Sequence, residues 1–298
     1  FGPVIGRLPD ITYPLHLLST SYAYLLLGGG FLAALFYLFS LRLPETIAIV
    51  FFWALFSVVS AAGNGAIARV ETYVTAAMVA ALLMLSALQW KVLSFEVLYA
   101  THPSVVAAIG IFLFAVSGFS GVGEVVEIVG RKKKASYSSV IVGTMISAFL
   151  TWIFGVIFFL ASRGTLGERV IEFNSYVPSN YMWLLPVLGL TGIATSYITT
   201  SAELKYVFRG DFGLTKMAAA VLAYCLPISL LLVASHEFVR VISFIGAVFI
   251  GLNASMICWI AVIKIKPSSM TKVFIKIAYA LLTATYIGFA LYTVYKAF

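Results

Sequence analysis

Charged side chains are scarce in this sequence. Asp, Glu, Lys and Arg together account for 10% of its 298 residues, whereas hydrophobic residues account for 62%. Soluble domains contain about 25% charged residues, and even a well-packed soluble fold leaves a large surface in contact with water. The composition therefore excludes an ordinary soluble domain and predicts a protein that is solvated by lipid.

The apolar stretches also lack the alternation of polar and apolar residues that marks membrane β-strands. Backbone groups inside a bilayer must be paired within the protein, which leaves α-helices as the expected spanning elements, about 20 residues each. Nine stretches of at least 19 residues contain no Asp, Glu, Lys or Arg. We therefore expect a single all-α membrane domain over residues 1–298, with spans at 11–41, 46–68, 72–90, 97–123, 135–162, 173–202, 217–236, 241–263 and 277–295.

Residue types that build metal centres or catalytic sites are sparse as well. The two cysteines, Cys225 and Cys258, lie in separate apolar stretches, so neither a disulfide framework nor a metal cluster is expected. The sequence contains no H-E-x-x-H motif, no G-x-S-x-G motif and no clustered aspartates. We expect no enzymatic activity and no cofactor.

The basic residues give the chain a formal net charge of +8, which in a soluble protein would suggest a nucleic-acid partner. Here they lie between the apolar stretches, where Lys and Arg report membrane topology. If residue 1 is cytoplasmic, 13 of them fall in inside loops and six in outside loops. This bias predicts a multi-pass protein of the cytoplasmic membrane, with the residue 1 end inside, the C-terminus outside and no nucleic-acid partner.

The fourth stretch contains an unusual run of small and polar residues, Ser117-Gly118-Phe119-Ser120-Gly121. Glycine favours release from helical geometry, and serine can bond to the freed backbone groups. An unwound backbone at this depth lines a cavity or is buried in protein, and the amides of the following half-helix would face an anionic group such as a carboxylate. Close helix packing through small residues is the alternative, and the sequence leaves both open.

This stretch resembles the sixth helix of the amino acid–polyamine–organocation superfamily, whose signature reads F-A-x-S-G-F-x followed by acidic residues and a basic end. Two positions depart from that pattern: Ser120 stands where many members carry Glu, and Gly123 where many carry Pro. The Ser120 difference argues against members that bind cationic or exchanged substrates through that acid. The matching residues are Phe114, Ala115, Ser117, Gly118, Phe119, Glu124, Glu127 and the run 131–134.

A second segment, residues 189–214, resembles the eighth helix of the amino acid/auxin permease branch, where a Thr-Ser-aromatic step precedes a basic cytoplasmic turn. The helix count between the two matches agrees, and it makes the stretch at 11–41, with LLLGGGFLAAL at 25–35, the third helix of the family. The resemblance implies a leucine-transporter-like bundle of two inverted repeats, with broken first and sixth helices at the midplane. It also implies that nine spans of an expected eleven are present and that the chain is truncated at its N-terminus.

The resemblance implies roles for individual side chains. Phe114 matches an aromatic gate over bound substrate. Thr195 and Ser196 would ligate sodium, because oxygen ligands suit a hard cation; bonds from their hydroxyls to a carbonyl one turn earlier are the alternative. Asn253 lies mid-membrane and is expected to bond across helices. The expected substrate-binding residues are Phe114, Ser117, Gly118, Phe119, Ser120 and Gly121.

Two coupling ions remain open. Proton-coupled relatives can replace sodium with a lysine amine in the fifth helix, here residues 72–90, whose sole ionisable side chain is the phenol of Tyr73. This favours Na+ at Thr195 and Ser196. The rival is a proton relay through Glu124, which would alternatively pair with the basic run 131–134.

These features together predict a secondary active transporter that moves amino acids, with neutral or aromatic ones favoured, across the cytoplasmic membrane by alternating access. Its expected partners are an amino-acid substrate and the lipid bilayer. The alternative is an amino-acid sensor on the same fold, similar to the germinant-receptor relatives of the superfamily. A sensor would bind its ligand without moving it.

Overall fold

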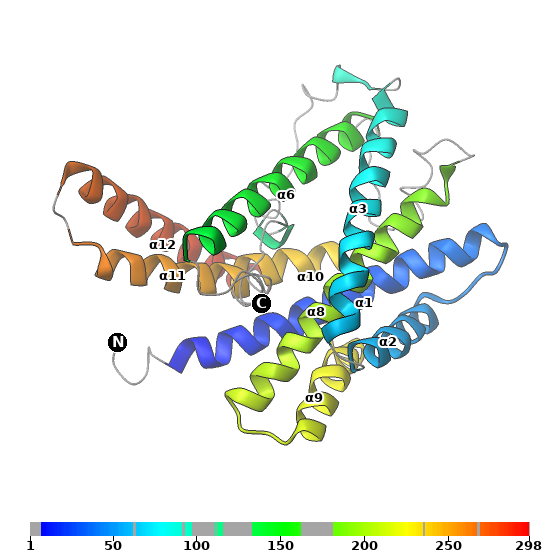
Figure 1. Ribbon diagram of the computed structural model, residues 1–298, viewed down its shortest axis with the longest axis horizontal. Coiled ribbons are helices and arrows are strands. Elements are labelled where there is room, and N and C mark those ends of the chain that lie inside the picture. Colours follow the sequence, from blue (N-terminus) through cyan, green and yellow to red (C-terminus); the bar gives the residue numbers. More distant parts are fainter. Residues whose placement is uncertain are drawn as a thin grey trace. The chain divides into compact units, whose positions relative to one another are not determined.

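The structure is a computed structural model that describes residues 7–61, 64–90, 93–96, 111, 113–115, 133–161, 181–234, 236–266 and 269–297. All regular elements within these ranges are helices (Figure 1). The α-helices are α1 (Leu8–Leu38), α2 (Glu45–Ala61), α3 (Asn64–Gln89), α6 (Lys133–Ala161), α8 (Leu184–Gly210), α9 (Lys216–Ser229), α10 (Phe238–Phe244), α11 (Gly251–Lys264) and α12 (Met270–Ala297). A 3-10 turn, η6 (Leu230–Leu232), follows α9, and a π-helix, η7 (Ile245–Ile250), joins α10 to α11.

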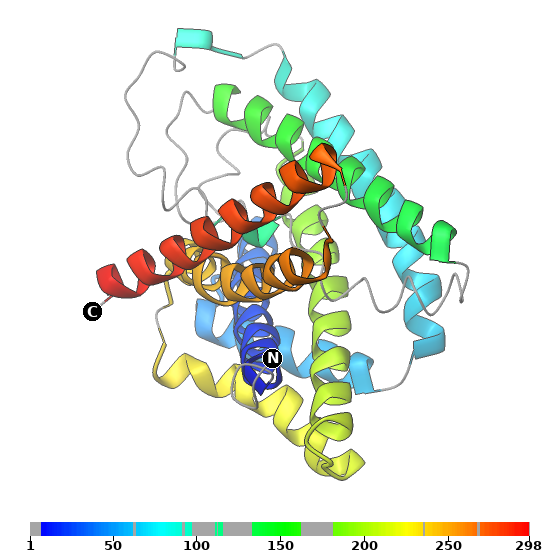
Figure 2. The same ribbon diagram turned by 90° about the vertical axis from the view of Figure 1, so that its left-hand side faces the viewer.

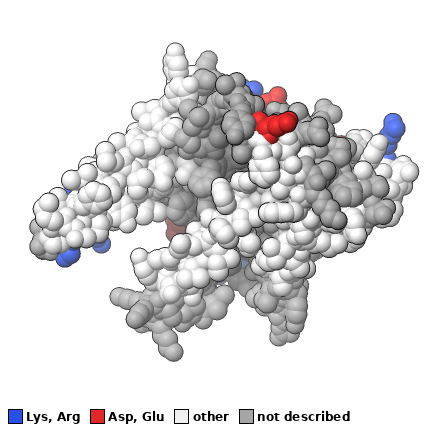
Figure 3. Space-filling model, turned by 90° about the horizontal axis from the view of Figure 1, so that it is seen from above, with Lys and Arg blue, Asp and Glu red and all other residues white. Residues whose placement is uncertain are grey.

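Several of these helices suit a bilayer. Within the described part of the chain, five helices are long and apolar enough to cross a membrane: α1, α6, α8, α12 and the continuous stretch from α10 to α11. The apolar helices at Glu45–Ala61, Val74–Gln89 and Lys216–Leu232 are shorter. On the face drawn in Figure 3 the described surface carries few charged side chains. The protein is therefore a helical membrane protein, as its composition predicts.

Eight of the nine predicted stretches overlap a described helix. The remaining one, 97–123, has described residues at 111 and 113–115 alone, and these are helical. The stretch predicted at 173–202 differs most, because α8 begins at Leu184 and continues to Gly210. Helical hydrogen bonding carries on past Glu203 and Lys205, where a rule based on charge-free residues has to stop. The number of spans stays a prediction.

The chain divides into two compact units. Unit 1 contains residues 1–19, 103–117 and 239–298, and unit 2 contains residues 20–102 and 118–238. Helix α1 begins in unit 1 and continues into unit 2. In unit 1, α12 packs along α11 and η7, and Figure 2 shows α11 and α12 in a second view.

Helix α8 is the central element of unit 2, because it contacts α2, α3 and α9 and approaches α1. Two glycines allow the closest approaches. A Cβ atom on Gly189 would overlap the ring of Phe31 in α1, and one on Gly192 would lie 2.9 Å from the sulfur of Met78 in α3. Glycine at these two positions therefore lets α8 lie against both neighbours.

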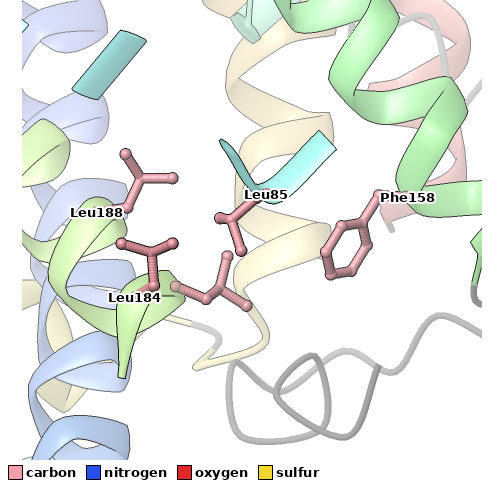
Figure 4. Close-up of a cluster of buried hydrophobic side chains, with 5 residues drawn as sticks. Leu85, Phe158, Leu184 and Leu188 are labelled. Carbon is pink, nitrogen blue, oxygen red and sulfur yellow. The ribbon is translucent and has the colours of Figure 1, made fainter. Parts of the chain in front are cut away.

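The apolar core at the N-terminal end of α8 joins three helices. Leu85 of α3 and Phe158 of α6 pack with Leu184, Leu185 and Leu188 of α8 (Figure 4). Each of these side chains is at most 8% exposed. Burial of a leucine or phenylalanine side chain stabilises a fold in water by roughly 1.5–3 kcal/mol, but lipid tails are apolar too, so this cluster is held chiefly by close packing.

Candidate functional site

Of the two segments that resemble transporter helices, the structure describes residues 189–214 in full but only a small part of the fourth stretch. Phe114 lies in a helical segment and is half-buried. The other expected substrate-binding residues, Ser117 to Gly121, lie outside the described residues, as does Glu124. The expected break in the fourth stretch thus stays a prediction, and the candidate site is built from α8 and its neighbours.

The middle of α8 is unusually rich in hydroxyl groups. Six of the seven residues from Thr195 to Ser201 carry one, in the sequence TSYITTS. They lie within a helix that is long and apolar enough to cross a membrane. Because hydroxyl groups inside a bilayer must find partners within the protein, their contacts show how this part of α8 is used.

Thr195 and Ser196 share one backbone acceptor. Both hydroxyls donate to the carbonyl oxygen of Gly192, each at 2.9 Å. This is the local bonding that was the alternative to ion binding. It consumes the hydroxyl protons and leaves lone pairs on both hydroxyl oxygens. Three oxygen atoms from Gly192, Thr195 and Ser196 therefore gather within one turn of helix.

A tyrosine of α1 reaches the same turn. The side chains of Tyr24 and Ser196 are hydrogen-bonded to each other. Seven residues further along α1, Phe31 meets Gly189, which is seven residues earlier in α8. The two helices therefore run antiparallel where they touch. The hydroxyl-rich turn of α8 faces a phenol of α1 inside unit 2.

Helix α8 also contacts α2 and α9. The sequence did not predict these contacts. Tyr197 is fully buried, and its phenol oxygen lies 2.8 Å from the hydroxyl oxygen of Ser57 in α2. Tyr224 of α9 donates to the Ser60 hydroxyl at 3.3 Å, and Ser60 in turn donates to the carbonyl oxygen of Ile198 at 3.1 Å. The four side chains of Ser57, Ser60, Tyr197 and Tyr224 form a buried hydroxyl cluster that ties three helices together.

The packing around this cluster is aromatic. The ring of Phe52 meets that of Tyr197 edge-on, with centroids 5.7 Å apart. The indole N–H of Trp53 donates to the backbone oxygen of Tyr224 at 2.8 Å. The high density of hydroxyl residues in TSYITTS was the available signal for such a cluster, although it does not identify the partners.

The expectation for Asn253 is confirmed. This buried amide bonds across helices, because its Oδ1 atom accepts a hydrogen bond of 2.8 Å from Thr12 of α1. Cys225 and Cys258 are free thiols, one exposed and one buried. Within the described ranges, no three His, Cys, Asp or Glu residues gather as metal ligands.

The local chemistry of α8 is thus that of an oxygen-lined, partly buried helix face next to a phenol, inside a helical membrane protein. Such a face can coordinate an alkali cation or hydrogen-bond a small polar ligand. No known family model matches the chain, and no curated protein matches it.

Proposed function

We propose that the protein is a secondary active transporter of amino acids, with neutral or aromatic substrates favoured, which works by alternating access in the cytoplasmic membrane. The observation that carries this proposal is the run of six hydroxyl side chains between Thr195 and Ser201, in a helix that is long and apolar enough to cross a membrane. Polar groups placed inside a membrane bundle commonly mark substrate or ion pathways. The resemblance of the segment from Phe114 to the basic run 131–134, and of residues 189–214, to two transporter helices points to the same function.

The proposed coupling ion is Na+. Alkali cations prefer oxygen ligands. After their protons bond to Gly192, the hydroxyl oxygen of Thr195 keeps both lone pairs, and that of Ser196 keeps one beside its bond with Tyr24. A complete site needs further oxygens, for which carbonyls of an unwound helix are the expected source. The rival proposal, proton coupling through Glu124, needs no such site.

Uptake into proteoliposomes distinguishes the two ions. Labelled neutral amino acids are offered first with a sodium gradient at constant pH, and then with a pH gradient in sodium-free buffer. We expect uptake in the first condition and its loss in the Thr195→Ala, Ser196→Ala double variant. A Thr191→Ala variant is the matched control, because it removes a hydroxyl that bonds to the same helix at Val187 and Leu188 without belonging to the oxygen trio. Sodium-independent uptake that the double variant leaves intact would rule out the sodium site.

The proposed architecture is the leucine-transporter-like bundle with nine spans in this chain, and its substrate lies at an unwound segment from Ser117 to Gly121. Replacing Gly118 with Leu fills that space and restores helical geometry, so we expect binding of the amino acid to be lost while the protein still inserts in the membrane. Calorimetry or scintillation proximity measures the binding. Unchanged affinity in Gly118→Leu would contradict this placement.

An amino-acid sensor is the second candidate, because the same oxygen-lined face would suit a protein that binds an amino acid without moving it. Counterflow separates the two functions. Proteoliposomes loaded with unlabelled amino acid accumulate external label transiently if the protein is a transporter. Ligand binding without counterflow, in protein shown to be folded, would favour the sensor.

A further inference from the structure

The last part of the sequence is basic and contains no acidic residue. From residue 238 to residue 298 there are five Lys and one Arg, and neither Asp nor Glu. In the sequence of unit 1, to which nearly all of this segment belongs, the sole acidic residue is Asp10, in the first turn of α1. Unit 1 therefore carries a local excess of positive charge.

Four of these lysines lie where α11 is joined to α12. Lys264 is the last residue of α11, Lys266 lies in the connection, and Lys272 and Lys276 lie in the first two turns of α12. We call the segment from Lys264 to Lys276 the closed end of the α11–α12 hairpin. Both helices belong to stretches that are long and apolar enough to cross a membrane, and they pack along each other (Figures 1 and 2). Because the connection is too short to cross a bilayer, all four lysines lie at the same membrane surface.

The side chains of these lysines are accessible. Lys264, Lys266 and Lys272 are exposed, and Lys276 is partly exposed. Lys272 and Lys276 are four residues apart in α12 and therefore share one face of it, where two like charges repel each other. An anion beside this face relieves the repulsion.

Exposed apolar side chains accompany the charges. Met270 and Phe274 are 85% and 75% exposed, and Ile263 and Ile277 also lie at the surface. Such a combination suits the boundary between acyl chains and headgroups, where apolar groups contact the lipid tails and lysine stems extend toward water. Lys276 lies six residues into α12, about 9 Å along its axis, so its long side chain extends along the helix to bring the ammonium group toward the headgroups.

We propose that the closed end of the α11–α12 hairpin binds the headgroups of anionic phospholipids through the ammonium groups of its four lysines. Clusters of about four or more basic residues directly beside a membrane span attract anionic lipids, and salt weakens the attraction. A role in topology requires these lysines during insertion, whereas lipid binding persists in the folded protein. The proposal does not depend on the transport function, because it uses no residue of α8 or of the fourth stretch.

The experiment uses the full chain in liposomes, with Cys225→Ser and Cys258→Ala. A fluorophore is attached through Thr271→Cys, beside the lysines, or through Tyr295→Cys, at the other end of α12. Quenching is measured against the mole fraction of brominated phosphatidylglycerol, which is anionic, or of brominated phosphatidylcholine, which is zwitterionic. The two curves give the relative association constant of the two lipids near the fluorophore.

Two test variants each remove two positive charges from the closed end. The control removes two as well, by Arg240→Gln with Lys296→Gln, at the opposite ends of the same two membrane stretches. A general attraction by net charge would therefore change equally in all three. The test variants are Lys264→Gln with Lys266→Gln, and Lys272→Gln with Lys276→Gln.

At residue 271 we expect phosphatidylglycerol to be preferred by about fivefold, the effect of one lysine at an anionic membrane surface, and at residue 295 we expect a smaller preference. Each test variant should lower the preference at residue 271 by about half or more, added sodium chloride should lower it in the chain with all four lysines, and the control should leave it unchanged.

Equal association of the two lipids at residue 271, or an equal decrease in the control, would overturn the proposal. Inorganic phosphate at the same ionic strength as the sodium chloride tests for a soluble ligand. If phosphate abolishes the preference where chloride does not, the lysines bind free phosphate and lipid binding is refuted. The two test variants change different parts of the hairpin, so misfolding of one leaves the other as a test.

Discussion

The hydroxyl pair at the contact of α2 and α8 allows a quantitative test of what holds unit 2 together. In Tyr197→Phe the ring keeps its edge-on contact with Phe52, but the oxygen 2.8 Å from Ser57 is removed. The Ser57 hydroxyl, 8% exposed, then remains buried without this partner. Leaving a buried group unpaired costs about 1–3 kcal/mol in soluble proteins, and interhelical bonds in a membrane protein average about 0.6 with a maximum near 1.7 kcal/mol. We expect a loss of about 1 kcal/mol.

A double-mutant cycle isolates the pair itself. The free energy of unfolding is measured by titrating bicelle-reconstituted protein with sodium dodecyl sulfate for the original chain, Tyr197→Phe, Ser57→Ala and the double variant. Because both single changes remove the same bond, the double change should cost less than their sum by about 0.5–1.5 kcal/mol. Tyr295→Phe, at a position 81% exposed, is the control and should change stability by less than about 0.5 kcal/mol. Additive single effects would refute the claim that the two hydroxyls act together.

Three further predictions concern single positions. In Gly29→Ala the new Cβ atom would meet the backbone of Ile49, so we expect the free energy of unfolding in bicelles to fall by about 1–3 kcal/mol. The control is Gly155→Ala, whose new Cβ atom has no other atom within 4 Å, and it should leave the free energy of unfolding unchanged or raise it by up to about 1 kcal/mol. Equal effects of the two changes would contradict the close approach of α1 and α2 at Gly29. Thr215 accepts the N–H of Ala218 at 3.3 Å as the N-cap of α9, so Thr215→Ala should speed hydrogen exchange at the start of α9 by severalfold, and Thr215→Ser should not. The charge bias of the loops predicts that a cysteine added after residue 298 of a Cys225→Ser, Cys258→Ala chain reacts with an impermeant maleimide from outside intact cells; labelling in inverted vesicles alone would reverse the proposed orientation.

The sequence was sufficient to place most helices, because lipid imposes a simple requirement on them: long stretches without charge. It was less informative wherever the end of a helix is not set by the membrane surface, and α8 therefore extends beyond its charge-free stretch to Gly210. The cross-helix role of Asn253 could be predicted, since a lone amide in a membrane has few other ways to find a partner. The identity of that partner, Thr12, could not be predicted from the sequence.

Two other features depend on geometry that no local pattern encodes. The hydroxyl cluster joins Ser57, Ser60, Tyr197 and Tyr224, and which hydroxyls meet depends on how α2, α8 and α9 cross. The π-helix has the sequence IGAVFI, which is indistinguishable in composition from an ordinary apolar helix. The sequence identifies Thr195 and Ser196 as adjacent hydroxyls midway along a span, and their role in ion binding stays a prediction. Their shared acceptor Gly192 and the contact with Tyr24 emerge solely from the packed structure.

The small number of buried side chains in helix α6 bears on how this helix folds. None of its side chains from Tyr137 to Val156 is buried, and its buried residues are Ile157, Phe158 and Leu160 near its C-terminal end. A helix with so few buried side chains among its described residues would be marginal in water, where packing supplies most helical stability. In a bilayer the cost of an unpaired amide is enough to maintain it. The folding of α6 is therefore decided at the moment of membrane insertion, and harmful substitutions in its first 20 or so residues should act by lowering insertion efficiency at the translocon, before any partner helix is in place.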